Sequence, residues 1–192
     1  HILYIAEEDN GVWMYDARPN ESFKPKMIQA TMPKNNSKIK DDVEGLSIYE
    51  QNNGKSYLVV SSQGNNSYAL FNLANPEEYI GSFNVMDDKV DGVEETDGIH
   101  VCSKAIGNSY PKGIFIAQDG FNFDGKTKKP QNFKVVDWRK IEKALKWLDI
   151  GDVWGIGRRL AIKMHDNGVH KAWDLLQKPE MGRRNFLSLL FR

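Results

Sequence analysis

Short apolar segments that alternate with turn residues constrain the fold of this chain more than any other feature of its sequence. Asn10-Gly11, Asn53-Gly54 and Gly64-Asn65-Asn66 are typical of tight turns between strands. The expected strands are residues 2–6, 12–16, 27–30, 43–49, 56–62, 68–73, 79–85, 98–102, 113–117 and 133–138. Strands at intervals of about ten residues predict an antiparallel all-β sandwich, barrel or propeller. Helical periodicity begins only after Trp138, with one helix at 139–147 and two short ones further on.

Composition places the chain among globular proteins and hints at two segments. It has 192 residues, of which 40% are hydrophobic and 27% charged, enough to bury a core. Residues 1–150 carry 18 basic and 22 acidic side chains, whereas residues 151–192 carry 8 and 4. No apolar run is long enough to span a membrane, and the first residues show no signal-peptide pattern. The single Cys102 is expected to be a small core residue.

Acidic side chains gather where expected strands begin or end. Asp42 and Glu44 are two residues apart, so on an extended backbone both would point to one face and could share a ligand. Two further groups stand at other strand ends: Glu7, Glu8 and Asp9, and then Asp87, Asp88, Asp91, Glu94, Glu95 and Asp97. Carboxylates without interleaved Cys or His favour calcium over zinc. The alternative is that these acidic loops are simply solvated.

A set of longer motifs carries a resemblance. They are LYIAEEDNGVW at residues 3–13, DVEGL at 42–46, SSQGNNSY at 61–68, ETDGI at 95–99, IAQDG at 116–120 and QNFK at 131–134. In order and spacing they resemble the β-propeller phytases over roughly residues 1–145. The resemblance implies a six-bladed propeller of antiparallel four-stranded blades with a calcium-lined cleft. This chain would form about half of it, followed by a small α-helical appendix.

The resemblance also implies a function and the residues that perform it. The reaction would be calcium-dependent hydrolysis of the phosphate monoesters of phytate, with a metal-activated water attacking phosphorus. By position, four carboxylates match the active-site calcium ligands of the family: Glu8, Asp42, Glu44 and Asp97. Asp91 matches a further calcium-associated carboxylate, and Gln63 and Asn65 match polar residues that line the same region. An extracellular or periplasmic location would follow from the family.

The chain departs from the family in two respects. His100 stands where relatives often carry Asp, and the family's first blades, with further calcium ligands and most phosphate-holding residues, precede the matched region. About half a propeller leaves strand edges exposed, so the missing half or a second copy is an expected partner. One alternative to the enzyme is therefore an inactive propeller fragment that binds calcium without turnover.

Two nucleotide- and calcium-binding patterns are formally present but fail on context. Residues 120–127 satisfy the P-loop pattern, yet Pro130 and an expected strand follow where a P-loop must open a helix. The acidic loop fails as an EF-hand, because Lys89 takes a ligand position and Gly98 stands where the bidentate Glu should be.

The last part of the chain changes character. Residues 150–192 resemble the helix-hairpin-helix region of Y-family translesion DNA polymerases, and residues 153–159 are its characteristic stretch. We therefore expect domains at 1–148 and 149–192. Residues that would contact a DNA backbone there are Gly155, Gly157, Arg158, Arg159 and Lys163. The alternative is that the hairpin only packs two helices and its basic side chains are solvated. His165 and His170 are expected to be surface residues.

Overall fold

The computed structural model describes residues 1–18, 24–35, 38–51, 56–147, 158–169, 171 and 174. The chain divides into two compact units, His1–Trp138 and Arg139–Arg192. The first unit consists of antiparallel sheets, and the helices described belong to the end of the chain. The prediction of an all-β protein with a helical appendix is therefore confirmed, and the predicted boundary near residue 148 stays a prediction.

The first sheet has the order β1-β2-β3 and begins with a tight hairpin. β1 (Ile2–Glu7) pairs with β2 (Gly11–Asp16), and β3 (Lys26–Ile28) adds to β2. The prediction that the third strand reaches residue 30 is wrong, because a 3₁₀ turn, η1 (Gln29–Thr31), follows β3. The carboxylate of Glu77 accepts the N–H groups of Gln29 (3.1 Å) and Ala30 (2.9 Å), so these amides are satisfied without a strand partner.

The second sheet is a four-stranded antiparallel meander, β4-β5-β6-β7, as expected of a propeller blade. A 3₁₀ turn, η2 (Pro33–Asn35), precedes it. Its strands are β4 (Val43–Glu50), β5 (Ser56–Ser62), β6 (Ser67–Asn72) and β7 (Asn75–Phe83). The 3₁₀ turn η3 (Gln63–Asn65) joins β5 to β6. β7 begins four residues before the predicted start at residue 79 and ends at residue 83 instead of 85.

The third sheet has the order β12-β9-β8. Its strands are β8 (Ile99–Cys102), β9 (Ile114–Asp119) and β12 (Asn132–Asp137). Between β9 and β12 lies a short hairpin, β10 (Phe123–Asp124) and β11 (Thr127–Lys128), which the sequence did not predict. The P-loop-like residues 120–127 contribute to this hairpin and open no helix, as the sequence predicted. Cys102 is half-buried in β8 and is not the core residue expected.

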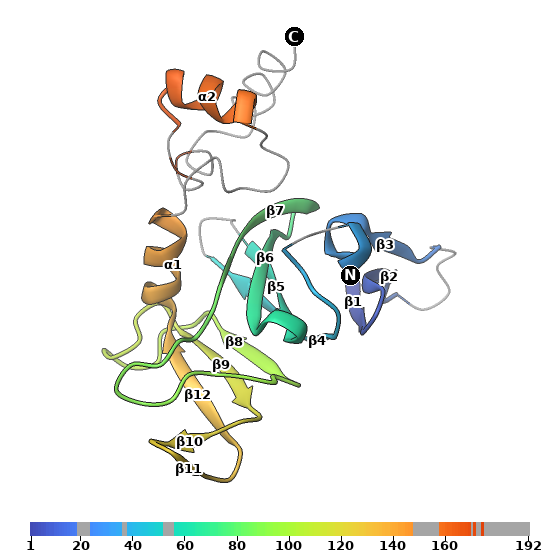
Figure 1. Ribbon diagram of the computed structural model, residues 1–192. Coiled ribbons are helices and arrows are strands. Elements are labelled where there is room, and N and C mark those ends of the chain that lie inside the picture. Colours follow the sequence, from blue (N-terminus) through green and yellow to red (C-terminus); the bar gives the residue numbers. More distant parts are fainter. Residues whose placement is uncertain are drawn as a thin grey trace. The chain divides into compact units, whose positions relative to one another are not determined.

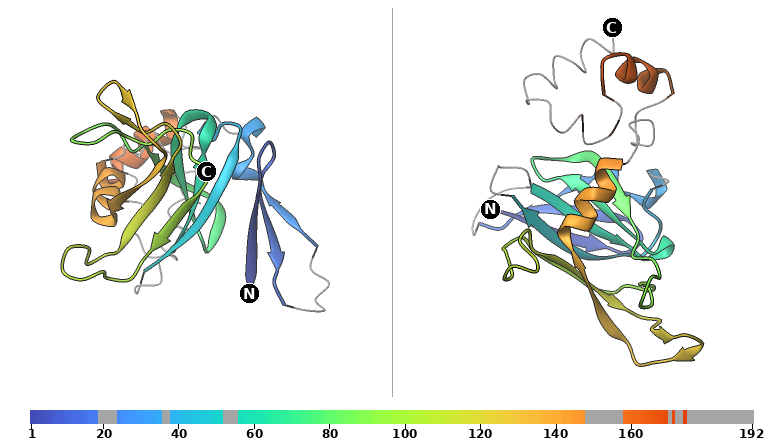
Figure 2. Two further views of the ribbon diagram at one scale, coloured as in Figure 1. Left: turned by 90° about the horizontal axis from the view of Figure 1, so that it is seen from below. Right: turned by 90° about the vertical axis from the view of Figure 1, so that its left-hand side faces the viewer.

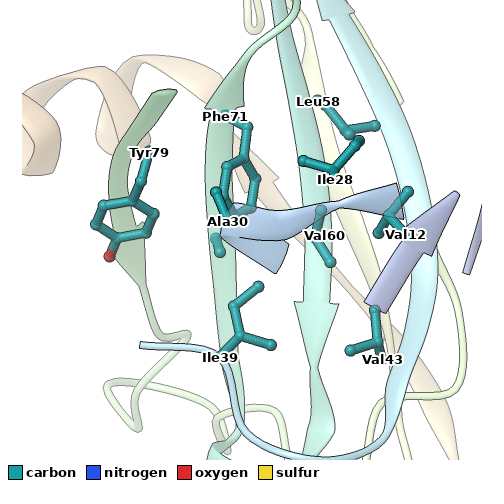
Figure 3. Packing of buried hydrophobic residues seen from close by; sticks show 10 residues of the cluster. Val12, Ile28, Ala30, Ile39, Val43, Leu58, Val60, Phe71 and Tyr79 are labelled. Carbon is teal, nitrogen blue, oxygen red and sulfur yellow. The ribbon is translucent and has the colours of Figure 1, made fainter. Parts of the chain in front are cut away.

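Within the first unit, the β4–β7 sheet lies between the other two sheets (Figures 1 and 2). Its strands therefore bury both faces, and β5 is buried along nearly its whole length. One face packs against the first sheet, where Leu58 and Phe71 lie against Val12 and Ile28 (Figure 3). Apolar burial of this kind is the main source of stability for the unit.

The opposite face of the β4–β7 sheet meets the third sheet through aromatic side chains. Tyr68 and Phe83 contact Phe115 of β9, with ring centroids 4.7 and 5.2 Å apart in edge-to-face arrangements. Tyr49 stacks on Trp138 with centroids 3.7 Å apart. These contacts fix the third sheet against the second.

The second unit contains two described helices, α1 (Trp138–Trp147), whose first residue closes the first unit, and α2 (Arg158–Asp166). α1 starts one residue before the predicted helix and ends where predicted. Two residues after the end of α2 lies a left-handed glycine, Gly168 (φ +73°), and the N–H of Val169 donates to the carbonyl of Met164. None of the helices described is long and apolar enough to cross a membrane.

Candidate active site

Three loops of the first unit are joined by backbone hydrogen bonds at the start of β4. The N–H of Val43 donates to the carbonyl of Glu8 in the β1–β2 turn, at 3.0 Å. On the other side, the N–H of Gln63 in η3 donates to the carbonyl of Asp42, also at 3.0 Å. Residues far apart in sequence are thereby brought to one place, and the predicted residues Glu8, Asp42 and Gln63 lie in the joined segments.

The backbone at Asp42 and Glu44 is irregular. Asp42 has φ +64°, in the left-handed region that non-glycine residues rarely adopt, and the β4–β5 pairing shifts register between Val43 and Leu46. The reasoning that strand alternation places both carboxylates on one face is therefore wrong, because Asp42 precedes the strand and is not extended. The bulge, rather than a regular strand, sets where these side chains lie.

Three of the predicted carboxylates act on the fourth, Glu44. Burial of Glu44 is the largest cause that raises the pKa of its carboxyl above the ordinary value. Three other carboxylates raise the pKa of Glu44 further: Glu8, Asp97 and Asp42. Glu8 lies in the β1–β2 turn, Asp42 directly before β4 and Asp97 in the loop before β8. Folding therefore brings negative charges from three segments to act on Glu44. Across the described part of the chain, no three Asp, Glu, His or Cys side chains form a ready metal cage.

Asp97 is held from two different sheets. The Nε2 of Gln63, in the β5–β6 turn, donates to Oδ1 of Asp97 at 3.1 Å. The N–H of Asp97 donates to Oε1 of Gln118, on β9, at 2.9 Å. One glutamine therefore holds the carboxylate of Asp97 and the other holds its backbone.

The preceding residues of this loop are also fixed. The N–H of Glu94 donates to Oδ1 of the buried Asp119 at 3.2 Å, and the N–H of Glu95 donates to Oδ1 of Asn66 at 3.1 Å. The hydroxyl of Thr96 is hydrogen-bonded to that of Tyr68 at 2.6 Å, and both side chains are buried. Residues 94–97 are therefore held one after another, and Asp97 is presented on an ordered backbone.

A glycine allows the second and third sheets to approach at the site. A Cβ added to Gly45 would lie 2.7 Å from the backbone nitrogen of Ile99. Only glycine fits so close an approach without displacing the neighbouring backbone. Gly45 directly follows Glu44, and Ile99 is two residues after Asp97, so this contact packs together the two segments that carry these carboxylates.

Asn65, which is predicted to line the site, lies in η3 between β5 and β6. Its Oδ1 accepts hydrogen bonds from the hydroxyls of Ser62 (2.8 Å) and Ser67 (2.7 Å). The side chain of Asn65 thus stabilises the β5–β6 turn that carries Gln63.

Asp91 lies at a separate place, beside a cavity of about 480 Å³ between the acidic loop and the β10–β11 hairpin. Its Oδ2 accepts the N–H of Phe123 at 2.7 Å and lies 4.0 Å from Nζ of Lys134. The same ammonium donates to Oδ2 of Asp119 at 2.7 Å. Asp91 is not among the groups that raise the pKa of Glu44. His100, which departs from the family pattern, is exposed on β8.

The predicted DNA-contacting residues fall in the second unit. Gly155 and Gly157 lie outside the described residues, and Arg158 is the first residue of α2. Arg159 and Lys163 are exposed on that helix. His170 also lies outside the described residues, and His165 is half-buried rather than on the surface.

Sequence reasoning missed Gln118 as a site residue. The residue was visible only as part of the IAQDG motif, where nothing distinguishes it from its neighbours. Its contact with Asp97 depends on how β9 lies against the loop before β8, which no local pattern encodes.

Comparison with known proteins identifies the family. A family model described as Phytase matches residues 1–158. The chain belongs to the phytase family. The resemblance inferred from the motifs is thereby confirmed. This phytase-family chain is 43% identical over 144 residues to the 3-phytase of Bacillus subtilis (strain 168). That match covers 74% of the chain but only 37% of the relative, so the chain spans little more than a third of the 3-phytase it matches.

Part of the chain is also similar to DNA polymerase IV. It is 37% identical over 81 residues to that protein from Staphylococcus aureus (strain MRSA252), covering 42% of the chain and 21% of the relative. The strain bovine RF122 / ET3-1 protein is 34% identical over 84 residues, covering 44% and 24%. The predicted second resemblance is thus present, over a small part of the polymerase.

Proposed function

We propose that this chain provides the calcium site of a phytase, which hydrolyses phosphate monoesters of phytate. The observation that carries the proposal is that hydrogen bonds and the Gly45–Ile99 contact join the segments that bear Glu8, Asp42, Glu44 and Asp97. These segments are up to 89 residues apart in the sequence, from residue 8 to residue 97. Membership of the phytase family supports the reaction class. The partial six-bladed propeller is part of the same proposal, with the three sheets as successive blades.

The residues fit calcium by their chemistry. Carboxylate oxygens are the ligands that calcium prefers, and gathered carboxylates are stabilised by a nearby cation. The residues that would hold calcium are Glu8, Asp42, Glu44 and Asp97, with Asp91 at a separate site. The chemistry that calcium supplies when bound is neutralisation of phosphate charge and a lowered pKa of its water, which becomes nucleophilic. The chain itself keeps Asp97 in place through Gln63 and Gln118.

The proposal is tested by phosphate release from phytate, measured with the purified chain in saturating calcium and again with a chelator. We expect release that the chelator abolishes and that Glu44→Ala loses. Glu50→Ala is a matched control, because Glu50 is an exposed carboxylate at the other end of the same strand. Release that persists in chelator, or in Glu44→Ala, would contradict the proposal.

A chain that binds calcium but releases no phosphate would correspond to the alternative, an inactive calcium-binding propeller fragment. Calcium binding is measured separately, as the calcium-induced rise in Tm, which reports ligand binding to the folded state. The remainder of a propeller, or self-association, is the partner we propose for the exposed strand edges. An extracellular or periplasmic location is likewise proposed from the family.

A second candidate function is binding of the DNA backbone through the tail. It is favoured by the similarity to DNA polymerase IV and by the exposed basic side chains of Arg159 and Lys163 on α2. DNA binding that weakens with salt and is lost in an Arg158→Ala, Arg159→Ala variant would support it. Binding unchanged by that variant would exclude this role for the hairpin, and Lys140→Ala, at an exposed lysine of α1, is the control.

A further inference from the structure

Gln118 makes two hydrogen bonds to adjacent residues of the loop that carries Asp97. Its backbone N–H donates to the carbonyl of Gly98 at 2.9 Å, and its side-chain Oε1 accepts the N–H of Asp97, also at 2.9 Å. One residue of β9 therefore holds the backbone on both sides of the peptide bond between Asp97 and Gly98. Among the side chains of the described residues, only that of Gln118 accepts a hydrogen bond from the N–H of Asp97.

The other end of the same side chain is unsatisfied. Nε2 of Gln118 is buried and has no hydrogen-bond partner among the described residues. A buried donor without a partner costs stability, typically more than a hydrogen bond contributes. Turning the amide over would place this donor against the Asp97 N–H and remove the one bond that Oε1 makes. A glutamine at this position therefore costs stability through its buried, unpaired Nε2, while its Oε1 holds the backbone of Asp97.

We propose that Gln118 is a positioning residue of the carboxylate site, which fixes the backbone of Asp97 so that its carboxylate stays in hydrogen-bond reach of Gln63 in η3. The inference rests on the proposed function, since the purpose of the positioning is calcium binding. Gln63 holds the carboxylate of Asp97 from the second sheet, whereas Gln118 holds the backbone from the third. The position of Asp97 therefore depends on two sheets at once.

The test uses Gln118→Met, which keeps the length of the side chain and removes the acceptor. We expect calcium affinity, measured by calorimetric titration of the chain, to fall by about two- to tenfold, the worth of one net hydrogen bond. Exchange of the Asp97 amide hydrogen, followed by NMR in chelator, should become faster, while the Tm in chelator should not fall. Gln131→Met, at an exposed glutamine before β12, should change none of these quantities.

A second variant and a second background keep the test decisive. Gln118→Glu retains an acceptor oxygen and should restore protection of the Asp97 amide. In an Asp97→Asn background, Gln118→Met should weaken calcium binding less than it does in the unmodified chain, because the two residues act together. Equal weakening in both backgrounds, or unchanged affinity in Gln118→Met, would overturn the inference.

Failure of the proposed function gives a different result. If the unmodified chain binds no calcium, the proposed function is overturned. The positioning role is then tested by the rate of hydrogen exchange at the Asp97 amide alone. An unchanged rate in Gln118→Met would overturn that role as well.

Discussion

Replacing Gly45 by alanine tests the close approach that the site requires. The added Cβ would lie 2.7 Å from the backbone nitrogen of Ile99 and 3.0 Å from its Cγ1. Non-bonded carbon contacts are comfortable at about 3.5 Å, so β4 and β8 would have to move apart by about 0.8 Å. The atom in the way belongs to the backbone of a paired strand, and no rotamer change can remove it.

The expected loss of stability follows from this overlap. Inserting a methyl group into a packed contact costs about 1–3 kcal/mol, and a clash with backbone favours the middle of that range, about 2 kcal/mol. For a unit of this size each kcal/mol lowers Tm by about 4 °C, so Gly45→Ala should melt about 8 °C lower. Calcium-induced stabilisation should also shrink, because Glu44 lies on one of the two strands that separate and Asp97 lies two residues before the other.

The assay is thermal unfolding followed by circular dichroism, in chelator and in calcium. Gly98→Ala is the control at the same strand contact, because its added Cβ would meet no atom within 4 Å and its φ lies outside the left-handed region. If Gly45→Ala melts like the unmodified chain, or if Gly98→Ala is equally destabilised, the close-packing argument is refuted.

Three further predictions concern charged and titrating groups. Because the raised pKa of Glu44 means that its charged form costs stability as pH rises through that pKa, Glu44→Gln should melt higher than the unmodified chain in chelator at pH 7. The same variant should lose the calcium-induced rise in Tm. Lys134→Met leaves the fully buried Asp119 without its ammonium partner and should cost about 3 kcal/mol by urea unfolding, whereas Lys129→Met, at an exposed ion pair, should cost under about 1 kcal/mol. Burial raises the pKa of Tyr68 from 10.0 to about 12, so the unfolded chain loses this proton first and stability should fall by about 2 kcal/mol between pH 10 and 12. A Tyr68→Phe variant that shows the same fall would contradict this assignment.

Most strands could be predicted because their signals are local. The Asn10-Gly11 turn and the flanking apolar residues gave the first hairpin nearly residue by residue. Where the prediction failed, a distant group or a very short element was responsible. The carboxylate of Glu77, 48 residues after Gln29 in the sequence, accepts hydrogen bonds from the amides of Gln29 and Ala30 directly after β3. The β10–β11 hairpin has two-residue strands, which are too short to show a pattern.

The membership of the candidate site stays a prediction, and its geometry was not predicted from the sequence. Carboxylates at strand ends and their motif context pointed to Glu8, Asp42, Glu44 and Asp97. The left-handed backbone of Asp42 was not foreseen, because the bulge depends on pairing with β5.

By itself, the sequence determined the antiparallel strands, the turns between them, the family and the kinds of side chain offered at the loop ends. Alternating burial and turn preferences act over a few residues, so they can be read locally. Only the tertiary structure decided that the segments carrying Glu44 and Asp97 pack together, and that Gln63 and Gln118 hold Asp97 from two sheets. That outcome depends on how closely the sheets pack, at Gly45 against Ile99, and such packing is a property of the whole unit rather than of any one segment.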